Sequence, residues 1–69
     1  MASDKLLSRF GRRIPRLRLE RKLSQEELAF RADLHRTYVS SVERAERNVS
    51  LINIYRLAEA LEIPANDLL

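Results

Sequence analysis

A chain of 69 residues, of which 45% are hydrophobic and 33% charged, has the composition of one small folded domain and not of a disordered chain. The absence of cysteine excludes disulfides, thiolate zinc sites and cysteine nucleophiles. No apolar run approaches the roughly 20 residues of a membrane-spanning helix, and no apolar signal core follows the start. We therefore expect a single cytoplasmic domain over residues 1–69.

The net charge of +3 is unevenly placed along the chain. Residues 1–22 contain eight lysines and arginines against two acids, whereas residues 23–69 contain five against eight. A basic segment beside a balanced one suggests a polyanionic partner, either nucleic acid or a membrane surface. The alternative is an ordinary solvated helix face.

Apolar residues recur at spacings of three and four throughout the chain, which predicts five helices and no sheet, an all-α fold. The first helix is expected over residues 4–21. Pro15 disturbs it, because proline has no amide hydrogen for the carbonyl of Gly11 and its ring clashes with that carbonyl. We expect a kink between Gly11 and Pro15; the alternative is a helix that begins near Ile14. One face of this helix carries Leu6, Phe10, Ile14, Leu17 and Arg21, and the adjacent face carries Lys5, Arg9, Arg12 and Arg16.

The segment Ser24-Gln25-Glu26-Glu27 has the form of a capping box, which predicts a second helix over residues 25–32. Asp33 is the residue best suited to a left-handed turn after it, because aspartate tolerates that conformation better than bulky side chains. A third helix is expected over residues 36–44, with one apolar edge and one polar face. Ser50 can cap a fourth helix over residues 51–61, in which Leu51 has core spacing, and a last helix is expected over residues 64–68.

The two short helices and the turn between Leu23 and Val42 are the most informative part of the sequence. Here the chain resembles the lambda-repressor-like and Cro-like (XRE-type) helix-turn-helix family, through LSQEELA, the hydrophobic turn residue Leu34 and the tail AEALEIPANDLL. It departs from the family at Asp33, where glycine is common. The segments LHRTYVSSVERAERN and SLINI are similar to controller proteins of restriction-modification systems. This resemblance implies a compact five-helix DNA-binding domain that regulates transcription.

In a fold of this kind the third helix lies in the major groove of double-stranded DNA, and side chains from its first turns reach the base edges. Arg36 can donate both arms of its guanidinium to O6 and N7 of guanine. Tyr38 can instead pack against the sugar-phosphate backbone. The residues expected to read bases are Arg36, Thr37, Tyr38, Ser40, Ser41 and Arg44.

Phosphates are expected at the amino-terminal ends of the second and fourth helices, where free backbone amides and the helix dipole favour an anion. Arg47, in the loop between the third and fourth helices, can bind a phosphate or enter a minor groove. The capping residues can equally serve their helices without DNA. The expected backbone contacts are Ser24, Gln25, Arg47, Asn48 and Ser50.

The resemblance also implies a partly buried ion pair between Arg18 and Glu43, which would join the first and third helices. His35 is the only histidine and stands beside no cysteine and no cluster of acids, so no metal site is expected. No paired carboxylates, glycine-rich phosphate loop or activated nucleophile is apparent. We therefore expect neither an enzyme nor a cofactor or small-molecule ligand.

Several apolar residues near the end of the chain exceed what one small core can cover, which favours a homodimer over a monomer. The alternative is that they complete the core of one chain. Controller proteins further imply two dimers on one operator. The residues expected at the dimer interface are Ile52, Leu61, Ile63, Leu68 and Leu69.

Two other functions are compatible with the same sequence pattern. A helical scaffold of this kind can bind protein instead of DNA, as an antitoxin or adaptor does, because fold does not determine function. The basic first helix can also lie on an anionic membrane, although its apolar row is then lost from the core.

Overall fold

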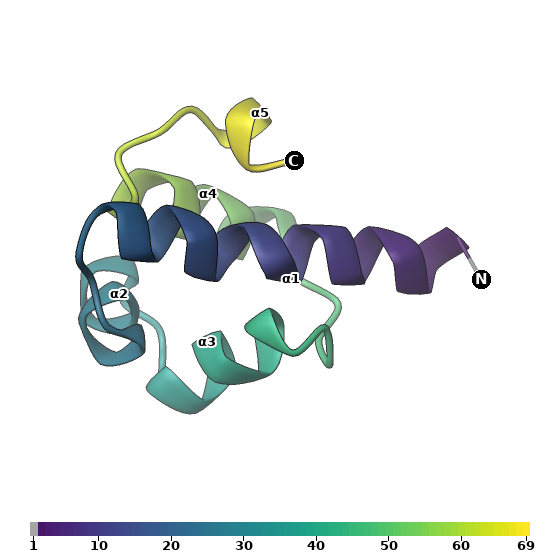
Figure 1. Cartoon of the computed structure of the whole chain (residues 1–69), viewed down its shortest axis with the longest axis horizontal. Helices are drawn as coiled ribbons and strands as arrows, with labels where there is room; N and C mark the ends of the chain where they lie inside the picture. Colours follow the sequence, from purple (N-terminus) through teal and green to yellow (C-terminus); the bar gives the residue numbers. More distant parts are fainter. Residues whose placement is uncertain (1) are drawn as a thin grey trace.

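The computed structural model describes residues 2–69 and contains five helices and no strand in that range, so the predicted all-α fold is confirmed. Helix α1 forms a long rod, with α2 and α3 on one side and α5 on the other (Figure 1). The predicted boundaries agree with the observed ones to within two residues, and those of the second helix agree at both ends. The helices are α1 (Ala2–Glu20), α2 (Gln25–Ala32), α3 (Arg36–Glu43), α4 (Leu51–Ala60) and α5 (Ala65–Leu68).

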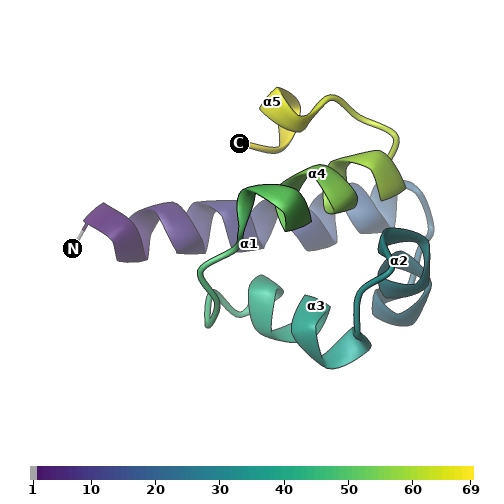
Figure 2. The same ribbon diagram turned by 180° about the vertical axis from the view of Figure 1, so that it is seen from behind.

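The kink predicted in α1 is wrong, because the helix continues through Pro15 and Figures 1 and 2 show no sharp bend in it. Contacts with α3 hold the helix on both sides of the proline. Before it, Gly11 lies against the backbone of α3, and after it Arg18 is bonded to Glu43. These contacts offset the hydrogen bond that proline cannot make.

Gly11 allows α1 and α3 to approach closely. A Cβ atom at this position would lie 2.6 Å from the carbonyl oxygen of Val42 and 3.1 Å from that of Glu43. Both atoms belong to the backbone, so neither can rotate away. The single glycine of the chain therefore serves a helix crossing and not a turn.

Four helices are followed, within one or two residues, by a residue in the left-handed conformation. The predicted left-handed residue is confirmed, since Asp33 has a φ of 58°. Three further residues, which the sequence pattern did not indicate, have φ values of 56°, 61° and 61°. After each of the four, the next amide donates to a carbonyl five residues earlier, over 2.8 to 3.0 Å, as in a Schellman motif. The three further residues are Lys22, Ala45 and Glu62.

The core lies between α1, the α2–α3 pair and the α4–α5 pair. Leu61 and Leu68, which were expected at a dimer interface, are completely buried in it, so that prediction is wrong for both. Leu51 has the opposite outcome: it was expected in the core and is 67% exposed. Leu61 and Leu68 are buried because the turn after α4 carries α5 back over the core (Figure 2). The largest fully buried side chains are Ile14, Leu28, Val39, Val42, Leu57, Leu61 and Leu68.

None of the helices in the described part of the chain has the length and hydrophobicity that a bilayer crossing requires.

Candidate nucleic-acid interface

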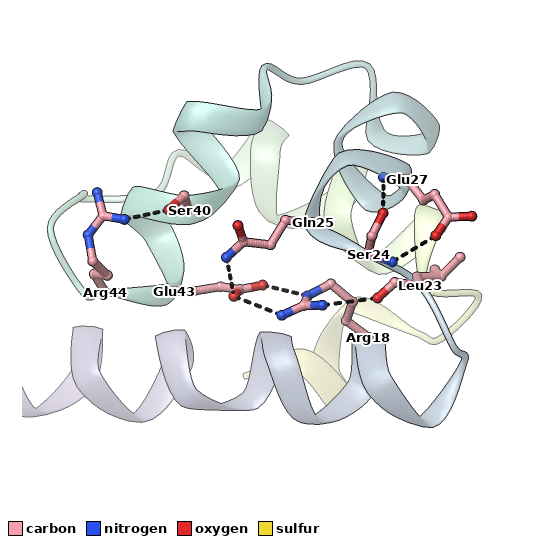
Figure 3. A network of polar contacts seen from close by, with 8 residues as sticks. All are labelled: Arg18, Leu23, Ser24, Gln25, Glu27, Ser40, Glu43 and Arg44. Atoms are coloured by element: carbon pink, nitrogen blue, oxygen red, sulfur yellow. Dashed lines mark hydrogen bonds and ion pairs between the residues drawn. The ribbon is translucent and has the colours of Figure 1, made fainter.

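Helices α2 and α3 are joined by a three-residue turn and form the predicted helix-turn-helix. At the start of α2, Ser24 Oγ accepts from the amide of Glu27 over 3.0 Å, and the amide of Ser24 donates to Glu27 Oε1 over 2.9 Å. This is the predicted capping box (Figure 3). It also lowers the pKa of Glu27, chiefly because the Ser24 amide donates to its carboxylate. The Ser24 hydroxyl is therefore already engaged in its own helix.

The first turn of α3 presents Arg36 and Thr37 to solvent. His35 precedes the helix and caps it, with Nδ1 accepting from the amide of Thr37 over 3.2 Å. The hydroxyl of Thr37 lies 2.8 Å from the same nitrogen. Arg36 is exposed and forms no ion pair with the residues that the structure describes. Its five guanidinium hydrogens are thus available for an external acceptor.

Tyr38 is held in place by residues outside its own helix. Its hydroxyl accepts from Asn53 Nδ2 over 3.0 Å, which ties α3 to the first turn of α4. The guanidinium of Arg47 lies over its ring, 5.4 Å from the centroid, as in a cation–π contact. Asn53 was not expected to contribute, because nothing in its spacing indicates that it meets Tyr38.

Ser41 was expected to read bases, and the structure contradicts this. Its side chain is buried, with only 6% of the residue exposed. Its hydroxyl donates to the carbonyl of Tyr38 over 2.8 Å and accepts from Arg47 Nε over 3.1 Å. Ser41 therefore stabilises the end of α3 and the position of Arg47 from the inside.

Arg44 and Ser40 lie together at the end of α3. Arg44 donates to Ser40 Oγ and forms an exposed ion pair with Glu46 over 3.1 Å. The hydrogen bond between Arg44 and Glu46 raises the pKa of Arg44 and lowers the pKa of Glu46. Exposed pairs of this kind contribute little to stability, so Arg44 can exchange Glu46 for a phosphate or a base at small cost.

Three helices meet at the carboxylate of Glu43, as Figure 3 shows. Arg18 of α1 reaches it through Nε over 2.9 Å and Nη2 over 3.2 Å, and a third nitrogen of Arg18 donates to the carbonyl of Leu23 over 3.0 Å. The two side chains are only 13% and 8% exposed. The ion pair implied by the resemblance is therefore present and nearly buried.

Gln25 joins the same carboxylate, since its Nε2 donates to Glu43 Oε1 over 2.8 Å. One of its two amide hydrogens is used in this bond, and the other remains for a second acceptor. Glu43 thus orients the side chain at the first position of α2, a contact that the sequence pattern did not indicate.

The start of α4 resembles the start of α2. Ser50 Oγ accepts from the amide of Asn53 over 3.1 Å and caps the helix. Asn48 is exposed in the loop before it. Their predicted contacts with the DNA backbone stay a prediction.

A shallow apolar groove is formed by α4 and the residues that lead into α5. Ile52, Tyr55 and Leu51 are exposed there, at 67%, 59% and 67%. Of the residues predicted at a dimer interface, Ile52 and Ile63 line this groove, whereas Leu69 lies in a separate depression beside the first half of α1. Leu51 was predicted in the core because of its spacing, and the sequence pattern gave no role to Tyr55. The groove is lined by Leu51, Ile52, Tyr55, Arg56, Ala58, Glu59, Ile63, Pro64 and Ala65.

Comparison with known proteins also identifies a helix-turn-helix protein. The chain matches the helix-turn-helix family over residues 14–68. It is 51% identical over 61 residues to control protein C.BamHI of Bacillus amyloliquefaciens, which covers 87% of this chain and 75% of that protein. The crystal structure of the restriction-modification controller protein C.AhdI from Aeromonas hydrophila superposes with a TM-score of 0.89 at 52% identity, over 91% of this chain and 96% of that one.

A further structure is that of the controller protein C.Esp1396I, solved as a tetramer in complex with its natural 35 base-pair operator. It has a TM-score of 0.85 at 35% identity and covers 91% of this chain and 83% of the other. The resemblance inferred from the sequence is confirmed, and the chain belongs to the helix-turn-helix family, with restriction-modification controller proteins among its relatives.

Proposed function

We propose that this protein is a transcription regulator that binds a symmetric DNA operator as a homodimer, in the manner of a restriction-modification controller. The observation that carries the proposal is the first turn of α3, where Arg36 is exposed and unpaired among the described residues while the opposite edge of the helix is locked into the core. We assign no catalytic activity to the protein and propose that it acts in the cytoplasm.

The geometry supports a division of roles between base and backbone contacts. Arg36 can bind O6 and N7 of guanine, which discriminates against a wrong base by about 1 to 3 kcal/mol. Thr37, Ser40 and Arg44 lie further along the same face. Gln25 can donate its remaining amide hydrogen to a phosphate while Glu43 holds the other. The guanidinium of Arg47 lies over the ring of Tyr38, and both side chains can contact the sugar-phosphate backbone there.

The apolar groove on α4 supports dimerisation. Its exposed isoleucine, leucine and tyrosine side chains form a patch that a second copy can cover by a two-fold contact. Two reading helices would then meet half-sites about 34 Å apart, one helical turn of DNA. The tetramer of the controller protein C.Esp1396I on its operator supports the further proposal of two dimers on one operator.

Selection of bound duplexes from a random pool tests the proposal, and a symmetric consensus is the expected result. With that consensus as the probe, Arg36→Ala should relax the preference at one base position in each half-site, at a cost of about 1 to 3 kcal/mol per position. Gln25→Ala should weaken binding to all sequences about equally, because it removes a backbone contact. Equal effects of both variants would contradict this division, and the absence of a consensus would contradict sequence-specific binding.

Dimerisation has its own test. Ile52→Glu places a charge in the apolar groove, so sedimentation should show a shift from dimer to monomer, with weaker operator binding as a consequence. Leu19→Glu is the matched control, because Leu19 is 64% exposed on α1 and lies outside the groove. A dimer that both variants preserve would place the interface elsewhere.

A further inference from the structure

The ring of His35 makes two contacts at the start of α3, and only one of them is needed to cap the helix. Its Nδ1 accepts from the amide of Thr37 over 3.2 Å, which is the cap. The hydroxyl of Thr37 lies closer to the same nitrogen, at 2.8 Å. An amide contact alone is enough to cap a helix, as Ser50 shows at α4. The second contact of His35 therefore calls for a reason other than helix stability.

The amide contact determines which nitrogen of the ring carries the hydrogen. A backbone amide can only donate, so Nδ1 is the unprotonated nitrogen and the hydrogen of the neutral ring lies on Nε2. An unprotonated nitrogen cannot donate, so the hydroxyl of Thr37 is the donor in the 2.8 Å contact. The single hydrogen of this hydroxyl is directed at His35, and only its lone pairs remain for an external partner.

This bond changes what Thr37 can recognise on DNA. A free threonine hydroxyl rotates, so it either donates to a base or accepts from one, and it discriminates poorly between the two. With its hydrogen held by His35, the hydroxyl of Thr37 can only accept. In the major groove the donors are the amino groups at N6 of adenine and N4 of cytosine. Both His35 and Thr37 are exposed beside Arg36, in the turn to which we assign base recognition.

We propose that His35 is a positioning residue for base recognition, which fixes the hydroxyl of Thr37 as an acceptor for the amino group of an adenine or a cytosine. The inference rests on the proposed function, since it requires α3 to lie in the major groove. Arg36 has the opposite character, because its guanidinium only donates. Adjacent positions of α3 thus recognise opposite hydrogen-bonding patterns, one on base acceptors and the other on a base donor.

The test removes one amino group at a time from the selected consensus duplex. Purine replaces adenine and 2-pyrimidinone replaces cytosine, and binding is measured at about pH 8, where an imidazole is neutral. At one position of the half-site, the wild-type protein should lose about 2- to 10-fold more affinity than Thr37→Val, the effect of one hydrogen bond. Thr37→Val is the matched control, because it keeps a methyl group and the shape of the side chain and lacks only the hydroxyl. It also corrects for the weaker base pairing of each probe.

Two substitutions of His35 separate the direction of the hydrogen bond from helix capping. His35→Asn places Oδ1 at the same bonded position as Nδ1, so it should keep both contacts and the full loss on that probe. His35→Ala frees the Thr37 hydroxyl to turn toward a neighbouring base acceptor, so its loss should fall toward that of Thr37→Val. The missing cap weakens binding to every probe alike and does not change this comparison. Melting curves verify that each variant is folded at the temperature of the assay.

Nitrogen NMR of the His35 ring tests the hydrogen-bond assignment without DNA. At the same pH the spectrum should show an unprotonated Nδ1 and a protonated Nε2, and a hydrogen on Nδ1 would overturn the inference. It is also overturned if no probe distinguishes the wild-type protein from Thr37→Val, or if His35→Ala keeps the full loss. In these cases a selected symmetric consensus still supports the proposed function. If no duplex is bound specifically, the proposed function itself has failed, and the inference with it.

Discussion

Replacement of Arg18 by methionine is expected to lower the free energy of unfolding by about 3 to 5 kcal/mol, because it leaves the carboxylate of Glu43 buried without its cation. Glu43 is 8% exposed on its side chain and accepts two of its three hydrogen bonds from Arg18. For a domain of this size each kcal/mol corresponds to about 4 to 8 °C in melting temperature. Thermal unfolding followed by circular dichroism measures the change.

Two controls separate this effect from a general loss of charge. Arg44→Met breaks the exposed pair with Glu46 and should change the melting temperature little. The double variant Arg18→Met/Glu43→Leu removes both buried charges and should be more stable than Arg18→Met alone. Each protein is measured at the same concentration, since dimerisation shifts the apparent stability. An unchanged melting temperature for Arg18→Met would show that water already screens the pair.

The substitution Gly11→Ala is expected to destabilise the protein by about 1 to 3 kcal/mol, as overpacking commonly does. In an exposed helix the same change stabilises by about 1 kcal/mol, because alanine is the better helix former. Here the new Cβ would meet the Val42 carbonyl at 2.6 Å, and α1 and α3 would have to separate. Chemical denaturation of the purified variant gives the sign directly.

The matched control for this substitution is Arg12→Ala, at the next residue of α1. Arg12 is exposed, so alanine there meets no backbone and should change the stability by less than about 0.5 kcal/mol. Separation of α1 from α3 should also move the reading helix and weaken operator binding by Gly11→Ala. A stabilised Gly11→Ala variant would mean that the crossing relaxes without strain.

Features that depend on neighbouring residues could be predicted from the sequence. The capping box at Ser24 and the left-handed Asp33 each involve a few adjacent positions, and both are present. The ion pair of Arg18 and Glu43 spans 25 positions and was accessible only through the resemblance.

Features that depend on how separate elements meet could not be predicted. Ser41 has the spacing of the polar face of α3, but it lies at the edge of that face and turns inward to Arg47. Leu61 and Leu51 have the same apolar character and both fit the period of α4. Only the return of α5 over the core decides that the first is buried and the second exposed.

The four left-handed helix ends bear on how the chain folds. A left-handed residue other than glycine costs roughly 1 to 2 kcal/mol locally. Three of the residues that follow, Leu23, Leu34 and Ile63, pack in or against the shared core, and this burial offsets the cost. An isolated fragment has no such core and would not end its helix at the same residue. The helix boundaries are therefore a property of the assembled chain, which should gain its structure in one cooperative transition and not helix by helix.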